Sequence, residues 1–218
     1  MKILILIFLC SMAAMAQQDA VPVEQEPNHK TILQNSFLQV FRVTLLPGKS
    51  TLFHTHSHND VAIRLSEAKV INEVAGRTNS PNLEHTGTVS ARTNEGRPFT
   101  HRMNNVGDTT FDVLDVQILK RPDGPETRAI TTAAAENPGM RVYRYELAPG
   151  ESSPVHTHER PYLIVAATDM KLKMTSPDGQ SSSHPVQAGD LHWIDAKVTH
   201  TLTNDGDTKG VLAEVELK

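Results

Sequence analysis

The chain has 218 residues, with 21 Lys and Arg against 25 Asp and Glu, which gives a formal net charge of −4 at pH 7. A mildly acidic chain without a run of basic residues has no electrostatic basis for binding nucleic acid or an anionic membrane surface. The one cysteine, Cys10, lies in the amino-terminal segment, so the rest of the chain offers no disulfide and no thiolate. Any metal must therefore be held by histidine and carboxylate.

The amino-terminal segment has the layout of a secretory signal peptide. Lys2 is followed by an apolar run over 3–9 and by the small-x-small triplet Ala14-Met15-Ala16. The run is far shorter than the roughly 18 residues that a membrane span needs. We predict that residues 1–16 are removed, that the protein is periplasmic or secreted, and that it has no integral membrane span. Residues 17–31 are expected to form a loosely held arm.

The rest of the chain predicts strands. Alternating segments rich in Val, Phe and Tyr end at Gly, Pro or Asp turns, which is typical of a barrel or sandwich. Helical periodicity is poor, and only 131–136 suggests a short helical turn. KRPDGPET at 120–127 is polar and rich in Pro and Gly, as expected of a linker. The predicted strands are 37–45, 111–119, 141–147, 171–175 and 211–217.

The chain contains an internal repeat. LLPGKSTLFHTH at 45–56 aligns with LAPGESSPVHTH at 147–158, at an offset of 102 residues. HRMNNVGDT at 101–109 aligns with HTLTNDGDT at 200–208, at an offset of 99, which indicates a three-residue insertion between the two blocks. Such self-similarity indicates a tandem duplication. We predict two domains, 32–120 and 140–218, joined by a linker over 121–139.

Each copy carries a His-Thr-His triplet and a later histidine. In a strand, residues i and i+2 point to the same face, about 6.5–7 Å apart, so both imidazoles can reach one metal ion. A third histidine from a distant strand would complete a face of ligands and leave open positions. The predicted metal ligands are His54, His56 and His101 in the first copy and His156, His158 and His200 in the second.

The sequence resembles a cupin, and specifically a bicupin. The first cupin motif, Gly-x5-His-x-His, is present from Gly48 and again from Gly150. The second motif keeps its spacing from Gly189 to Asn204, with Asp195 and Lys197 in place of Pro and Gly. The resemblance implies an all-β fold of two tandem small antiparallel barrels of the jelly-roll type, each with a metal site. Known bicupins include dioxygenases of the quercetinase type and oxalate-degrading enzymes, and dimers through barrel faces are common in the family.

The position of the family's carboxylate ligand departs from the motif. In the first copy Asp60 has the right spacing, one methylene shorter than Glu, and is a predicted metal ligand. His58 shares strand parity with the histidine pair and is a rival, although a solvated turn residue is the preferred interpretation. In the second copy Tyr162 and Leu163 occupy the expected positions, and Glu159 has the opposite parity. The second site is therefore either three-histidine or three-histidine with Tyr162 or Glu159 nearby.

The remaining histidines carry less weight. His192 beside Trp193 is interpreted as a half-buried structural pair, with a role lining the second barrel as the alternative. His29, His85 and His184 are expected to have no special role. The predicted cofactor is one or two divalent transition-metal ions among Mn, Fe, Cu, Ni and Zn. The first site is the expected redox or Lewis-acid site, and the second is expected to be Zn-like or degenerate.

The preferred function is an oxygenase-type enzyme, a cupin dioxygenase, that acts on a small organic molecule. Its substrate would meet an open metal position inside a barrel. Arg42, Arg64, Arg102 and Arg144 are candidate cations for an oxalate-decarboxylase-like enzyme, but strand parity does not orient them. Met103, Phe53 and Phe111 would suit an aromatic substrate instead. The further alternatives are a non-catalytic binder of a metal or small ligand, and a structural metal site. The sequence assigns no catalytic residue beyond the metal ligands.

Overall fold

A computed structural model describes residues 19–74, 77, 79–195 and 197–218. The predicted signal peptide lies outside the described residues. None of the described helical segments is long and apolar enough to cross a membrane.

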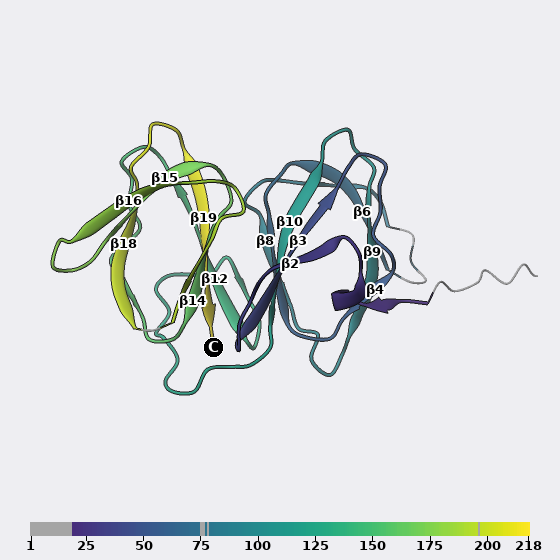
Figure 1. Cartoon of the computed structure of the whole chain (residues 1–218), viewed down its shortest axis with the longest axis horizontal. Helices are drawn as coiled ribbons and strands as arrows, with labels where there is room; N and C mark the ends of the chain where they lie inside the picture. Colours follow the sequence, from purple (N-terminus) through teal and green to yellow (C-terminus); the bar gives the residue numbers. More distant parts are fainter. Residues whose placement is uncertain (1–18, 75–76, 78, 196) are drawn as a thin grey trace, which may run out of the picture.

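The protein folds into two antiparallel β-barrels that lie side by side (Figure 1). The first barrel consists of sheets β1-β4-β9-β6-β7 and β2-β3-β10-β5-β8, and the second of β11-β12-β19-β14-β17 and β13-β18-β15-β16. The first barrel comprises β1 (Val21–Pro22), the short 3-10 helix η1 (Val23–Gln25), β2 (His29–Gln34), β3 (Leu38–Leu45), β4 (His54–His56), β5 (Asp60–Arg64), β6 (Ala68–Val74), β7 (Asn82–Glu84), β8 (Val89–Arg92), β9 (Phe99–Asn105) and β10 (Phe111–Ile118). The second comprises β11 (Ala135–Glu136), β12 (Met140–Leu147), β13 (His156–His158), β14 (Tyr162–Ala166), β15 (Met170–Thr175), β16 (Ser181–Val186), β17 (Leu191–Ile194), β18 (Val198–Asn204) and β19 (Gly210–Leu217). The predicted all-β fold is thus confirmed.

The two barrels repeat the same strand pairing. Asp115 in β10 lies opposite Phe41 and Ala62, and Glu214 in β19 lies opposite the residues 102 positions later, Tyr143 and Ile164. The offset changes to 99 between β8 and β9, where the first copy has residues 93–98 and the second has 195–197. The three-residue insertion predicted from the repeat therefore lies in this connection.

Two local expectations are wrong. The part of the amino-terminal arm that the structure describes is not loosely held, because β1 pairs with β4 and β2 pairs with β3. The segment 131–136 forms no helix; its end is β11, which pairs with β12. Its alanines favour a helix locally, but strand pairing to the second barrel overrides that weak preference.

Both Pro-Gly pairs make the turn that leads the chain to a His-Thr-His strand. Gly48 and Gly150 have φ angles of 74° and 78°, in the left-handed region where glycine is unstrained. The motif asparagines donate side-chain hydrogen bonds of 2.9 Å, Asn105 to the carbonyl of Leu45 and Asn204 to the carbonyl of Leu147. These two carbonyls end the strands that lead into the Pro-Gly turns. The shared glycine and asparagine are therefore structural, and they fix where each histidine pair begins.

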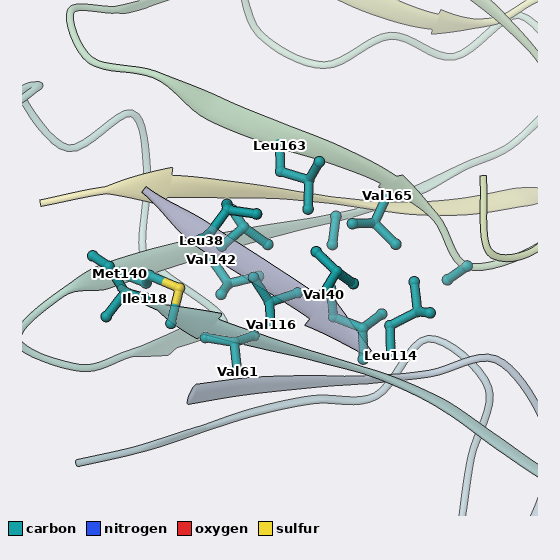
Figure 2. Close-up of a cluster of buried hydrophobic side chains, with 14 of the residues drawn as sticks. Leu38, Val40, Val61, Leu114, Val116, Ile118, Met140, Val142, Leu163 and Val165 are labelled. Atoms are coloured by element: carbon teal, nitrogen blue, oxygen red, sulfur yellow. The ribbon is translucent and has the colours of Figure 1, made fainter. Parts of the chain in front are cut away.

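A continuous apolar core joins the barrels (Figure 2). The sheet containing β3, β10 and β5 packs its outer face on the sheet containing β12, β19 and β14. β10 and β19 are buried on both faces, because one face lies inside a barrel and the other packs in this core. The core is also symmetric, because its residues match across the repeat: Leu38 with Met140, Val40 with Val142, Val61 with Leu163, Ile63 with Val165, Leu65 with Ala167, Leu114 with Ala213, Val116 with Val215 and Ile118 with Leu217.

Candidate metal centres

The structure brings the three predicted histidines of the first barrel together. His54 and His56 project from β4, and His101 lies directly opposite His54 on β9. All three side chains are buried. The Nε2 atoms of His56 and His101 are 3.2 Å apart, and the rings of His54 and His101 are centred 4.5 Å apart.

Hydrogen bonds at Nδ1 orient these rings. His54 Nδ1 lies 2.9 Å from the carbonyl of Leu52, and His101 Nδ1 lies 2.8 Å from Oδ1 of Asn72. A neutral imidazole carries one N–H, so donation from Nδ1 leaves a lone pair on Nε2, the usual arrangement of a metal-binding histidine. The Nε2 lone pairs are therefore directed into the barrel.

Burial also keeps these imidazoles neutral. Desolvation, followed by the nearby His29, lowers the pKa of His54 to about 4. Burial lowers the pKa of His56 and of His101 well below the ordinary value. Because a metal must displace any proton from its ligand, neutral histidines bind metal at pH 7 without that cost.

Asp60 lies beside the cluster, on the other side of the His56 ring. His56 Nδ1 is 3.4 Å from Oδ2 of Asp60 and 3.4 Å from Oδ2 of Asp115. These three residues form a group whose potential ligand atoms lie within 4.8 Å of one another. Asn94, from the inserted loop, donates a hydrogen bond of 2.6 Å to Asp60. The two carboxylates approach His56 Nδ1 without a hydrogen bond. The predicted role of Asp60 as a direct ligand stays a prediction.

His29, which was expected to have no role, belongs to the first centre. It is buried, its ring is centred 4.5 Å from that of His54, and it forms a potential ligand group with His54 and His56 within 4.8 Å. Its place at the start of β2 puts it inside the barrel. The position of His29 could not be predicted from the sequence, because the arm was not predicted to contain a strand.

The second barrel assembles His156, His158 and His200 around a carboxylate. Glu214 on β19 lies 3.0 Å from His156 Nε2, 3.1 Å from His200 Nε2 and 3.4 Å from His158 Nε2. All four side chains are buried, and they form one potential ligand group. The fourth ligand therefore comes from the last strand rather than from the position after the histidine pair.

Other candidates for the second site take different places. Tyr162 stacks on His158, with ring centres 3.7 Å apart. Glu159 forms an ion pair with Lys197 at 2.9 Å and does not join the histidines. His192 is exposed, and His58 is half-buried and joins none of the potential ligand groups among the described residues.

The inward acids of β10 and β19 were missed, although the repeat contained a signal. LDVQIL at 114–119 aligns with AEVELK at 213–218, so Asp115 and Glu214 occupy equivalent positions. Strand alternation places Asp115 with Phe111 and Val113 on the inner face of the first barrel. An acid at the same inward position in both copies predicts a role at each site.

The electrostatics of the second site differ from those of the first. Burial alone would raise the pKa of Glu214, but its contacts with the three histidines hold it well below the ordinary value. Burial would lower the pKa of His158, and its contacts with Glu214 and Glu216 instead raise it to about 8. His158 Nδ1 lies 2.7 Å from Glu216. In the chain alone, a buried ion pair therefore occupies the middle of the second site.

The cavities of the two barrels also differ. A cavity of about 60 Å³ in the first barrel is lined by His29, His54, His56 and His101 together with Arg64 and Arg92. Met103 and Phe111 line it as well, whereas Phe53 lies under Arg102. The second barrel has a hollow of about 360 Å³ lined by Ile164, Leu172, Met174, His184 and His192 among others. Among the described residues that line this hollow, none is one of the three clustered histidines.

Two barrels back to back, each with clustered histidines inside, define the bicupin architecture. The cupin domain family matches residues 143–216. The β-alanine degradation protein BauB of Pseudomonas aeruginosa is 30% identical over 91 residues, which cover 42% of this chain and 95% of that protein. The chain belongs to the cupin family.

Two solved bicupin-like structures share the fold. Salicylate 1,2-dioxygenase of Pseudoaminobacter salicylatoxidans aligns with a TM-score of 0.57 and 13% identity over 89% of this chain and 76% of that one. Oxalate decarboxylase of Lactobacillus farciminis aligns with a TM-score of 0.54 and 14% identity over 84% of this chain and 77% of that one.

Proposed function

We propose that this protein is an exported metal-dependent enzyme of the oxygenase type, which acts on a small organic acid in the first barrel. The second barrel would hold a structural metal ion. The observation that carries the proposal is the contrast between a second centre in which Glu214 fills the space between the three histidine Nε2 atoms and a first centre whose histidines line a polar cavity. Structural metal sites are closed, whereas catalytic sites keep an open position.

The second centre has the features of a closed site. Glu214 already contacts all three histidine Nε2 atoms. Tyr162 stacks on His158. Tyr145 stacks on His156, and the centres of these two rings are 6.1 Å apart. A metal held by these three histidines and Glu214 would be covered by the two tyrosine rings, which leaves little access for a substrate.

The first centre has room and charge for a small anion. Among the described residues, no carboxylate oxygen lies within 4.0 Å of the Arg92 guanidinium, which lines the cavity and lies over Phe99 at 4.2 Å from the ring centre. Arg64 also lines the cavity, but it is paired with Glu84 at 2.7 Å. Arg92 was not among the four arginines named from the sequence, of which Arg64 lines this cavity.

The size of the cavity favours a short acid over an aromatic one. One water needs about 10–15 Å³ of such volume, so a cavity of about 60 Å³ has room for roughly four to six waters. A metal held by His54, His56 and His101 would polarise a bound oxygen atom or activate dioxygen. Arg92 would bind the substrate carboxylate.

The comparisons are compatible with this proposal at the level of the fold. The same architecture serves a dioxygenase of salicylate and a decarboxylase of oxalate, and the sequence relative is a β-alanine degradation protein. Decarboxylation of a short acid is therefore the second candidate, favoured by the small cavity and by Arg92 in its lining. Export rests on the amino-terminal sequence alone, and cell fractionation tests it.

The test is turnover by the metal-loaded protein. The chain is loaded separately with Fe, Mn, Cu, Ni and Zn, and short carboxylic acids are screened for oxygen uptake and for release of carbon dioxide with and without oxygen. We expect oxygen-dependent turnover by the wild type. His101→Ala should abolish this turnover, and His200→Ala should retain it at temperatures below its own melting temperature. Oxygen-independent release of carbon dioxide would favour the decarboxylase, and absence of turnover with every metal would favour a binding protein.

A further inference from the structure

We infer that His29 is a fourth nitrogen ligand of the metal in the first barrel. The amino-terminal segment would then supply one of four histidines around that metal. This inference rests on the proposed metal site of the first barrel and deepens it. It gives β2 a part in the chemistry that the cupin motifs do not specify.

The position of His29 carries the first step. Its ring is centred 4.5 Å from that of His54 and 5.9 Å from that of His56, and its side chain is buried inside the barrel. One nitrogen from each of these three histidines lies within 4.8 Å of the others. Such spacing allows three imidazoles to converge on one ion with small side-chain adjustments, because metal–nitrogen bonds are about 2.0–2.1 Å.

The second step concerns which nitrogen of His29 is free. Nδ1 lies 2.7 Å from Oε2 of Glu26, so Nδ1 donates and Nε2 keeps its lone pair. Glu26 is buried, and it also accepts hydrogen bonds from the backbone of Asn28, His29 and Leu52 at 2.8, 3.1 and 3.0 Å. Burial would raise the pKa of Glu26, but these bonds lower it to about 2, so it is ionised at neutral pH. A carboxylate that orients a histidine in this way is typical of metal ligands.

The third step is a comparison of the two barrels at the same register. In the second barrel Glu214 reaches all three histidine Nε2 atoms. Its counterpart Asp115 is one methylene shorter and lies against Nδ1 of His56 instead. The first barrel therefore lacks a carboxylate that contacts all three histidine Nε2 atoms. His29 lies close enough to His54 and His56 to supply a fourth ligand instead.

The donor set determines the class of metal. Imidazole nitrogens suit Cu, Ni, Zn and Fe, whereas carboxylate oxygens favour Mn. A site with four histidines is therefore expected to discriminate against Mn more strongly than the second centre with Glu214.

The test counts nitrogen ligands with Cu²⁺ as the probe. The full chain is studied in the His200→Ala background, so that the first barrel is the site that is loaded, and folding is checked by circular dichroism. Pulsed electron paramagnetic resonance counts coordinated imidazoles through their remote nitrogens. We expect His29→Gln to lose one imidazole and at least about tenfold in affinity, and Glu26→Gln to lose about 10- to 100-fold in affinity. The control His85→Gln, at an exposed histidine, is expected to change neither.

The outcomes separate this inference from the proposed function. An unchanged imidazole count and Cu²⁺ affinity in His29→Gln would overturn the inference while leaving the enzyme proposal standing. Loss of one imidazole without turnover of any acid would support the inference and count against the enzyme. Failure of the first barrel to bind Cu²⁺, Ni²⁺ or Zn²⁺ would overturn the inference, and failure to bind Fe and Mn as well would overturn both. If His200→Ala does not fold, the mean imidazole count of the doubly loaded wild type is compared with that of His29→Gln.

Discussion

Glu214 shows how one methylene can change the character of a site. It contacts three histidines, and its counterpart Asp115 contacts only the far side of one. Burial, together with the neighbouring Asp60, raises the pKa of Asp115 well above its ordinary value, whereas contacts with three histidines hold the pKa of Glu214 well below it. The same strand position therefore holds acids whose pKa values are shifted in opposite directions in the two barrels.

Glu214→Gln is expected to lose the metal of the second barrel and to destabilise the metal-free chain. Removing one member of a buried ion pair costs about 3–5 kcal/mol, because it leaves the partner charge unpaired. Denaturant unfolding and elemental analysis measure the two effects. The matched variant Asp115→Asn should keep both metals and lose less than about 1 kcal/mol, since Asp115 approaches one histidine only at 3.4 Å and the amide has nearly the same shape. Equal losses in the two variants would contradict this account.

Arg92→Gln tests the proposed recognition of a carboxylate. Hydrogen bonds to charged groups are worth about 1.5–3 kcal/mol, so KM for the acid, or Ki for a non-reacting acid, should rise about 10- to 100-fold. The metal content should not change, because Arg92 is no ligand. Arg97→Gln, in the exposed part of the inserted loop, is the control and should leave KM as it is. A fall in kcat alone would argue against a binding role for Arg92.

At the level of elements, most strands could be predicted from alternation and turn residues. The expected strands at 37–45, 111–119 and 211–217 correspond to β3, β10 and β19 within one residue at each end. The repeat brought out the histidines because both copies keep them in the same spacing. His29 and Arg92 could not be found in this way, because neither lies in a block that the repeat matched or in a segment whose alternation predicted a strand. Propensity also failed at β11, where pairing with β12 decides the structure.

Gly87 joins a turn of the first barrel to the second, and its substitution tests that contact. Its φ is 77°, and a Cβ at this position would lie 2.7 Å from Val211 Cγ1. Gly96 has a φ of 73° with no atom within 4 Å of such a Cβ. Both alanine variants should lose about 1–2 kcal/mol for the left-handed backbone. Gly87→Ala should lose about 1–3 kcal/mol more through overpacking, measured by denaturant unfolding. Equal losses of stability in the two variants would mean that Val211 moves aside without an energetic cost.

At the level of the whole molecule, the alternation of a strand predicts one buried face and does not show what covers the other. Leu38 and Val40 point away from their own barrel, and only the structure shows that they pack against the other one. The core that the barrels share is as apolar as the interior of a single domain. The two barrels should therefore unfold in one cooperative transition.

Leu163→Ala is expected to destabilise both barrels by about 2–5 kcal/mol, because Leu163 is fully buried in the shared core. Calorimetry should show a single transition at lower temperature. Leu46→Ala, at a leucine that is 59% exposed, is the control and should stay within about 0.5 kcal/mol of the wild type. Two separate transitions in Leu163→Ala would show that the barrels fold independently.

The contact between the barrels has the form of the interface in a twofold dimer, because equivalent residues of the two copies contribute to one core. A dimer of identical chains must carry the same residues at both of its centres. Here the two halves are one polypeptide, so a change in β10 need not recur in β19. Glu214 and Asp115, or Tyr162 and Asp60, can differ without disturbing the shared core, because they lie on the inner faces of strands whose outer faces are matched. Covalent linkage thus keeps the symmetry of the scaffold while freeing the two centres to specialise.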